Sequence, residues 1–358
     1  MRVQLAAAAA AAIALCASSA QAGVTDINNA LEAMSYYNLI VRGNLTTTSE
    51  TEGRSFIGGS VTGGGATQFN ADNLSGTGLT VVGDYNGGGK ANTHGDIKVG
   101  GDVKTGVEFQ GSEAQTLTYG GTVQNTNVNF PDKTVKDTTL AATLTAERNA
   151  LFGDPSVSSD KGDFGELSTY LKNLTVTDPT ALTGSTLKFT STGDVAVFNI
   201  SDFSAALASI SELKFIYPAG YDLVVINVAG TNISLPGGFN FNGAVDDPSI
   251  PGTLKGPLSN VIWNFYEATS LDFGSKSWYG SVLAPTAQAK IGNFIEGTGV
   301  FAGLTANGEM HTPGLTDYRV PPPPPTTVVP EPASWALMIM GFGAAGAMMR
   351  RRRTALAA

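Results

Sequence analysis

The stretch Ile97-Lys98-Val99-Gly100-Gly101-Asp102-Val103 decides how we expect this chain to fold. A short run of β-type residues ends in glycine, and a polar residue and then an apolar one follow. The same order occurs four more times nearby, in residues 39–45, 56–61, 79–85 and 117–123. The glycines at the equivalent positions are Gly43, Gly59, Gly83, Gly101 and Gly121, spaced 16, 24, 18 and 20 residues apart. Short strands with glycine turns at an irregular period of about twenty residues indicate the rungs of a β-solenoid.

The same pattern returns late in the chain, in residues 278–283 and 300–304. We therefore expect the early and late blocks to belong to one stack. The predicted fold is mainly β, a β-solenoid of the right-handed β-helix-like kind with two or three packed helices. The alternative is a β-sandwich with glycine-rich turns, which the irregular rung length leaves open.

The sequence changes character between residue 132 and about residue 174, where glycine thins out. Apolar residues then recur at helical spacing, first Leu140, Leu144 and Leu151 and later Phe164, Leu167 and Leu171. This spacing predicts two helices, broken around Gly153-Asp154-Pro155. β-rich runs resume at residues 187–189, 195–200 and 223–228, and residues 203–210 allow one short helix.

The N-terminus has the order of a secretory signal peptide: Arg2, an apolar run over residues 5–17, and Ala20-Gln21-Ala22. We expect export through the Sec translocon and cleavage between Ala22 and Gly23. The only cysteine, Cys16, lies in this segment. The mature chain is therefore expected to have no disulfide and no thiol chemistry.

The C-terminus consists of five prolines at residues 321–325, then Pro330-Glu331-Pro332, an apolar segment over residues 333–349, and Arg350, Arg351, Arg352 and Arg353. A proline rod cannot join a core, so the folded body should end near Tyr318. The apolar segment is just long enough to span a bilayer, and the arginines would stay cytoplasmic. We thus expect a signal peptide (1–22), a solenoid domain (23–319), a linker (320–329), a tail (330–353) and a short end (354–358).

Residues 329–338 read Val-Pro-Glu-Pro-Ala-Ser-Trp-Ala-Leu-Met, and Gly341-Phe342-Gly343 and the arginine cluster follow. This tail resembles a PEP-CTERM sorting signal. The resemblance implies processing by an exosortase-type membrane enzyme. The protein would be anchored transiently in the inner membrane of a Gram-negative cell and would end at the cell surface or outside it.

A second resemblance rests on Val261-Ile262-Trp263-Asn264-Phe265 and on Gly280-Ser281-Val282-Leu283-Ala284-Pro285-Thr286-Ala287, followed by Glu296-Gly297 and His311. Residues 37–41, 52–54, 58–59 and 226–230 match as well. Together these segments resemble the choice-of-anchor A family over roughly residues 36–312. The resemblance implies a secreted, surface-attached, adhesin-like β-rich protein and supplies no catalytic residues.

Charge excludes one class of partner. Of 21 Lys and Arg residues, five lie in the two ends, which leaves 16 against 30 acidic residues, or a charge of about −14. Nucleic-acid binding needs clustered Lys or Arg, so we expect no nucleic-acid partner.

We find no motif for a cofactor, a metal or a catalytic nucleophile. The two histidines, His94 and His311, have no metal-ligand spacing, and we expect a surface residue and a hydrogen-bonding structural residue respectively. The stretch Gly87-Gly88-Gly89-Lys90-Ala91 lacks the leading glycine and the Ser or Thr of a phosphate loop, so it should be a rung turn. No serine lies in a nucleophile elbow.

The candidate carboxylates are Asp84, Asp102, Asp246, Asp247 and Glu296. Asp84 and Asp102 follow rung glycines at equivalent positions, so they could stack as a turn motif, a weak calcium site or a component of a polysaccharide-cleaving site. The preferred hypothesis is a non-enzymatic surface or matrix adhesin that binds exopolysaccharide or matrix protein. The alternatives are a polysaccharide-active enzyme and an ice-binding protein, although threonines do not recur at rung spacing.

Overall fold

The computed structural model describes residues 23–64, 67–111, 115–124, 128–129, 133–208, 210–216, 220–245 and 257–321. The chain divides into two compact units, residues 1–320 and 321–358. Most of the two predicted end signals lies outside the described residues, namely Ala22, Pro330, Glu331, Pro332, the apolar segment 333–349 and Arg350 to Arg353.

One turn of chain makes three faces. In the first turn, β1 (Leu39–Val41) ends just before Gly43, and β2 (Leu45–Thr47) follows the corner. Thr51 then forms isolated bridges to the next turns. Alternate side chains point inward, and Leu39, Val41 and Leu45 are all buried. We call the three surfaces the first, second and third face, in chain order.

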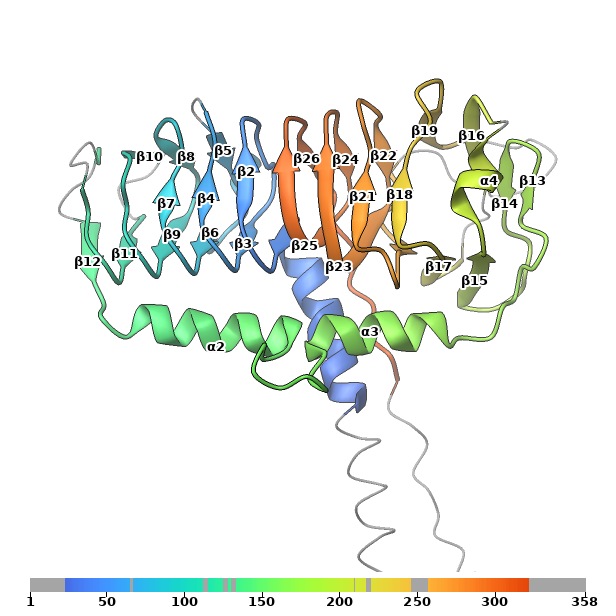
Figure 1. Ribbon diagram of the computed structural model, residues 1–358, viewed down its shortest axis with the longest axis horizontal. Helices are drawn as coiled ribbons and strands as arrows, with labels where there is room; N and C mark the ends of the chain where they lie inside the picture. The colour runs from blue at the N-terminus through green and yellow to red at the C-terminus, as the bar shows by residue number, and fades with distance from the viewer. Residues whose placement is uncertain are drawn as a thin grey trace, which may run out of the picture. The chain divides into compact units, whose positions relative to one another are not determined.

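The first face is one continuous sheet (Figure 1). Its strands, in spatial order, are β12 (Thr134–Lys136), β11 (Leu117–Tyr119), β9 (Asp96–Val99), β6 (Thr77–Val81), β3 (Ser55–Ile57), β1, β25 (Gly299–Ala306), β23 (Ser281–Ile291), β20 (Val261–Asn264), β17 (Leu223–Val228) and β15 (Val195–Ile200). The second face contains β7 (Tyr85–Asn86), β4 (Val61–Thr62), β2, the later portions of β25 and β23, β21 (Ser270–Asp272) and β18 (Asn232–Ser234).

The third face is made of three shorter sheets. These are β10 (Val107–Phe109), β8 (Ala91–Thr93) and β5 (Thr67–Phe69); β26 (Met310–His311), β24 (Ile295–Glu296) and β22 (Trp278–Tyr279); and β19 (Asn240–Ala244), β16 (Glu212–Ile216), β14 (Thr186–Lys188) and β13 (Leu182–Thr183). In the described residues every strand pair is parallel except β13 with β14. This confirms the solenoid, and the β-sandwich alternative is wrong.

The first and last turns of the solenoid meet in the middle of the stack, as the blue and orange strands of Figure 1 show. β1 pairs with β3 on one side and with β25 on the other, with Leu39 opposite Gly299 and Val41 opposite Phe301. We call the boundary between β1–β2 and β25–β26 the seam. The early turns run from the seam to one end and the late turns return to it, so the prediction of a single stack is confirmed.

Helices cover the outer side of the first face (Figure 1). α2 (Leu140–Phe152) lies beside the early turns and α3 (Gly162–Lys172) beside the late ones, with a further helix over residues 23–36. The predicted break between two helices is confirmed at Gly153, whose φ is 86°. The short helix allowed for residues 203–210 is α4 (Phe203–Leu207), so the described residues contain four helices rather than two or three. The helices and the outward side chains of the first face form a second apolar layer, which includes Ile40, Phe56, Val225, Ile262 and Val300.

The glycines of the repeated pattern form a column at the corner between the first and second faces. The backbone N–H of Gly59 donates to the carbonyl of Gly43 at 2.8 Å, and each later glycine donates to the one before it. A Cβ atom at Gly101 would lie 2.2 Å from Asp84 Oδ1 and 2.8 Å from the Gly83 carbonyl oxygen. The corner therefore requires glycine because adjacent turns approach too closely for any side chain.

The residue after each glycine forms a second column of hydrogen bonds. Asp84 Oδ1 accepts from the backbone N–H of Asp102 at 2.8 Å, and Asp102 Oδ1 accepts from that of Thr122 at 2.8 Å. Asn44 Oδ1 and Ser60 Oγ accept in the same way at the two preceding corners. Side-chain oxygens thus satisfy corner N–H groups that would otherwise lack a partner.

Two buried asparagines attach α3 to the first face. Asn264 Nδ2 donates to the Ser168 carbonyl at 2.9 Å and to Asn227 Oδ1 at 2.8 Å. Asn227 Nδ2 in turn donates to the carbonyl of Leu171 at 2.9 Å. Polar side chains that are buried in native proteins almost always have hydrogen-bond partners, as these two do. The Asn of the Trp-Asn-Phe element therefore has a structural role.

Replacing Gly101 with alanine tests the corner column. We expect Gly101→Ala to lower the free energy of unfolding by about 1–3 kcal/mol, because the added methyl group overlaps Asp84 and the previous turn. Gly238→Ala is the matched control, since a Cβ atom there meets nothing within 4 Å. Urea denaturation of both variants measures the difference, and an equal effect at the two positions would contradict this account of the corner.

Asp163 predicts a pH dependence of stability. It is 9 % exposed on α3, and burial, followed by the charge of Asp26, raises its pKa to about 6. The folded protein then binds this proton more tightly than the unfolded chain, whose carboxyl titrates at about 3.9. Its contribution to stability is therefore lost as pH rises from about 4 to about 6. In thermal melts across this range, the melting temperature of Asp163→Asn should rise relative to that of the wild type as pH increases. A difference in melting temperature that does not depend on pH would refute the assignment.

Candidate functional site

Asp84 and Asp102 stack on adjacent turns, as their spacing predicted, and the turn-motif interpretation is the one that fits. Each carboxylate caps a backbone N–H of the next turn. Asp84 Oδ2 also pairs with Lys104 Nζ at 2.6 Å, and Asp102 Oδ2 accepts from Gln124 at 3.1 Å. Hydrogen bonds from Lys104 and from the Asp102 N–H hold the pKa of the Asp84 carboxyl below its usual value. Both groups are thus occupied in holding the corner.

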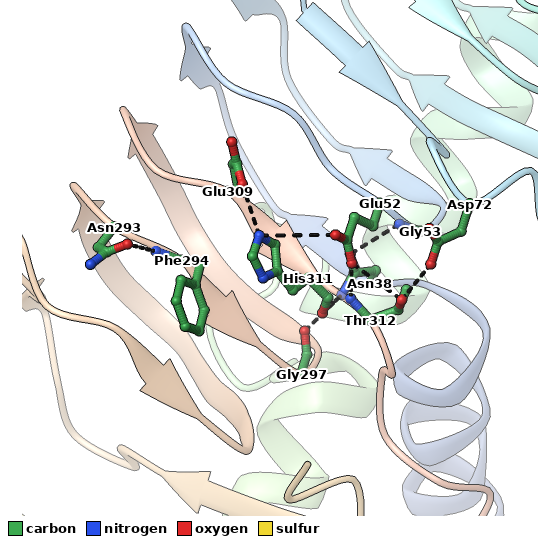
Figure 2. Close-up of polar contacts among 10 residues, drawn as sticks. All are labelled: Asn38, Glu52, Gly53, Asp72, Asn293, Phe294, Gly297, Glu309, His311 and Thr312. Carbon is green, nitrogen blue, oxygen red and sulfur yellow. Dashed lines mark hydrogen bonds and ion pairs between the residues drawn. The ribbon is translucent and has the colours of Figure 1, made fainter. Parts of the chain in front are cut away.

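A second group of candidates meets at the seam on the third face, and we call it the seam cluster: Glu50, Glu52, Asp72, Glu296, Glu309 and His311. Figure 2 shows His311 between Glu309 and Glu52, beside the ring of Phe294. His311 Nε2 lies 2.8 Å from Glu309 Oε2 and 3.9 Å from Glu52 Oε1. The His311 and Phe294 rings are stacked, with centroids 4.6 Å apart and planes 7° apart. His311 is the hydrogen-bonding residue that the sequence predicted.

The seam cluster joins the first turn to the last. Glu52 Oε2 accepts hydrogen bonds from the Thr312 N–H at 2.7 Å and from its hydroxyl at 3.2 Å (Figure 2). The same hydroxyl contacts the carboxylate of Asp72. Asn38 lies behind them, donating to the carbonyls of Gly297 at 2.7 Å and His311 at 3.0 Å. These contacts hold segments that are about 260 residues apart in sequence.

Two carboxyls of the seam cluster keep their protons more readily than usual. Burial, followed by the charges of Glu309 and Glu52, raises the pKa of Glu50. Burial also raises the pKa of Glu296, a protonated His311 opposes this effect, and Glu52 adds to it. Among the described residues, no side chain donates a hydrogen bond to Glu50 or Glu296. These two groups can therefore bind hydroxyl groups of a ligand.

The side chains of the seam cluster are partly exposed, 24 % for His311, 26 % for Glu52 and 44 % for Glu309. Cavities of about 510, 490 and 400 Å³ lie elsewhere among the described residues, and none of these is lined by a seam-cluster residue. Within the same residues, no group of three or more His, Cys, Asp or Glu side chains is arranged to hold a metal ion. The sequence named His311 and Glu296 as candidates but could not bring Glu50 or Asp72 to them, because the seam pairing is not visible in a local pattern.

The remaining candidates take structural places or lie outside the described residues. His94 is partly buried rather than a plain surface residue, and its Nδ1 atom is enclosed without a partner in the described structure. Residues 87–90 form the turn between β7 and β8, and Ala91 is the first residue of β8. Gly23 begins the first helix, and Asp246 and Asp247 are not described. Between residues 23 and 321, no described helix has both the length and the hydrophobicity needed to cross a bilayer.

The second face corrects the expectation that threonines do not recur at rung spacing. Thr62, Thr46 and Thr305 occupy equivalent outward positions on three adjacent turns, and the Thr46 and Thr62 hydroxyls are 3.0 Å apart. The run crosses the seam, so Thr305 lies more than 240 residues from the other two in the sequence, whereas Thr46 and Thr62 are 16 residues apart. Asn86 continues it on one side and Lys290 on the other.

Comparison with known proteins places this fold in a family. Residues 30–312 match the model described as "Putative Ice-binding-like adhesive domain", and residues 328–353 match the PEP-CTERM protein-sorting motif. A search of curated proteins found no match. A solved structure titled "Crystal structure of ice binding protein from an Antarctic bacterium Flavobacteriaceae" is 14 % identical, with 82 % of this chain and 84 % of that chain covered and a TM-score of 0.28. That similarity supports no inference about this chain.

The sorting motif and the adhesive domain together support export to the cell surface or the extracellular space, with processing by an exosortase-type system. The family match covers most of the chain, from the middle of the first helix to just after β26. The chain belongs to the ice-binding-like adhesive domain family.

Proposed function

We propose that this protein is a non-enzymatic adhesin that binds exopolysaccharide or matrix protein at the surface of a Gram-negative cell. Within its family we assign it to the choice-of-anchor A group, because it carries a Trp-Asn-Phe element at the end of β20 and a Leu-Ala-Pro element within β23. The observation that carries the proposal is the second face. It is an exposed array of polar side chains repeated at the spacing of the turns.

The second face suits an extended ligand. Its outward positions, from one end to the other, are occupied by Gln124, Lys104, Asn86, Thr62, Thr46, Thr305, Lys290, Asp272 and Ser234. Neighbouring parallel strands lie about 4.8 Å apart, so donors and acceptors recur along the stack without a deep pocket. Many weak contacts to one polymer chain add up by multivalency. The parallel stack fixes the array before the ligand arrives.

The end signals supply the route. We infer that the Sec translocon exports the chain, that cleavage separates Ala22 from Gly23, and that residues 333–349 hold the tail in the inner membrane during sorting. Arg350 to Arg353 keep the end of the chain on the cytoplasmic side. An exosortase-type enzyme then acts at Pro330-Glu331-Pro332, and the linker over residues 320–329 separates this tail from the solenoid domain over residues 23–319.

Two alternatives rest on particular observations. Glu50 and Glu296, with raised pKa values and no hydrogen-bond donor among the described residues, favour a polysaccharide-active enzyme. The run of Thr62, Thr46 and Thr305 favours ice binding. The carboxylates lie outside the cavities described above, and the threonine run ends at Asn86 and Lys290. We therefore prefer the adhesin.

A binding assay with the exported protein tests the proposal. We expect it to bind immobilised exopolysaccharide or matrix protein without releasing reducing ends. Thr46→Glu should weaken this binding several-fold because it puts a charge in the middle of the second face. Thr316→Glu, an exposed threonine outside that face, is the control.

Absence of binding to both kinds of matrix would refute the adhesin. Steady release of reducing ends would favour the enzyme instead. Equal binding by the wild type and the two variants would show that the second face does not contact the ligand. Ice recrystallisation assays on the same samples decide whether the threonine run acts on ice.

A further inference from the structure

A pocket of about 490 Å³ lies where α2 gives way to α3. One side is the α2–α3 connection, including Asp154, Ser158 and Lys161, and the other is made of residues that follow first-face strands. Figure 1 shows this connection as the loop between the two helices. The volume falls within the range of roughly 300–1,000 Å³ that is usual for small-ligand sites. Neither the proposed second-face array nor the seam cluster includes this pocket.

The solenoid side of the pocket comes from strands on both sides of the seam. Arg42 follows β1, Pro285 lies within β23, and both strands pair with β25 at Phe301. Proline has no N–H to donate, and the ladder between β23 and β25 is interrupted from Ala284 to Gln288. Tyr266, just after β20, lines the pocket as well. Pro285 of the Leu-Ala-Pro element thus lines this pocket in addition to forming part of β23.

The loop side of the pocket is held in place by its own hydrogen bonds. Asp160 Oδ2 accepts from the Asp154 N–H at 2.8 Å, and Asp160 Oδ1 accepts from the Gly162 N–H at 2.9 Å. Asp154 Oδ1 accepts from the N–H and hydroxyl of Ser156, at 2.8 and 2.7 Å. Both oxygens of Asp160 and one oxygen of Asp154 therefore accept hydrogen bonds within the loop. A wall that is ordered in advance loses little entropy when a ligand binds.

The cations of the pocket are left available. Among the described residues, none accepts a hydrogen bond or forms an ion pair with the Arg42 guanidinium. Lys161 Nζ has one contact, to the Thr169 hydroxyl at 3.4 Å. A guanidinium without a partner is suited to a carboxylate, which it binds through two parallel hydrogen bonds. The hydroxyls of Ser158 and Thr286, and the Tyr266 ring, offer polar and apolar contacts to the rest of a ligand.

We propose that this pocket binds a single carboxylated sugar residue of an acidic polysaccharide, with Arg42 holding the carboxylate. This inference rests on the proposed adhesive function and assigns it a specific ligand class. Without the five basic residues of its two ends the chain has 16 basic and 30 acidic residues, or a charge of about −14, which would repel an acidic polymer at long range. At physiological ionic strength, however, exposed charges are screened beyond about 8 Å, so the local pairing decides whether the polymer binds.

Calorimetric titration of the exported protein tests this site. The probes are a galacturonic acid tetrasaccharide and the neutral galactose tetrasaccharide. We expect the wild type to bind the acidic probe at least about tenfold more tightly, and Arg42→Gln to lose that preference. Arg42→Lys keeps the charge but not the paired hydrogen bonds, so it should be intermediate. Lys214→Gln removes one positive charge from an exposed position of β16 on the third face, outside the pocket and the second-face array, and should bind like the wild type.

Ser158→Trp supplies an independent variant, because Ser158 is exposed on the loop and a large ring there should block the pocket without touching the core. It should abolish binding of the acidic probe. Undiminished binding by both Arg42→Gln and Ser158→Trp would overturn the proposal. So would a wild type that binds matrix polysaccharide but not the acidic probe, and that result would leave the adhesin standing. A wild type that binds no matrix polysaccharide and no matrix protein would instead refute the adhesive function itself.

Discussion

Contact between successive turns at the glycine corner is the constraint on which the rest of the structure depends. Gly59, Gly83, Gly101 and Gly121 each donate a backbone hydrogen bond to the glycine one turn earlier. Their missing side chains leave room for the oxygens of Ser60, Asp84 and Asp102 to cap the neighbouring turn. Because the corner fixes how closely the turns approach, it also fixes the register in which apolar side chains fill the interior.

Local sequence was enough to predict the turns and the helices, because each depends on residues close together in the chain. The glycine pattern predicted the corner, and the spacing of Leu140 to Leu171 predicted α2 and α3 with a break at Gly153. Asp84 and Asp102 stack because their positions in the repeat are equivalent. The helix over residues 23–36 was missed, although Ile27, Leu31 and Met34 recur at helical spacing and are buried.

The candidate sites were harder to predict because they lie across the seam. His311 lies close to Glu52 because Thr51 is paired with Met310 of β26. Thr46 lies beside Thr305 because β2 pairs with β25 across the same seam. The pocket under the α2–α3 loop likewise combines Arg42 with Pro285. The helices cover the first face. The second face, the seam cluster and this pocket therefore remain to contact ligands. The surfaces on which the proposed adhesive function rests thus form where the end of the chain packs against its beginning.

The seam is therefore the central claim, and an engineered disulfide across it is the most direct measurement. Thr46 and Thr305 are paired outward residues, and the only natural cysteine, Cys16, precedes the predicted cleavage site. Parallel neighbours about 4.8 Å apart are within reach of a disulfide. Oxidised Thr46→Cys/Thr305→Cys protein should yield one cross-linked peptide pair in mass spectrometry. The control is the Thr46→Cys/Thr62→Cys protein, whose two cysteines lie on neighbouring turns on one side of the seam. A disulfide in this control together with free thiols in the Thr46→Cys/Thr305→Cys protein would contradict the seam.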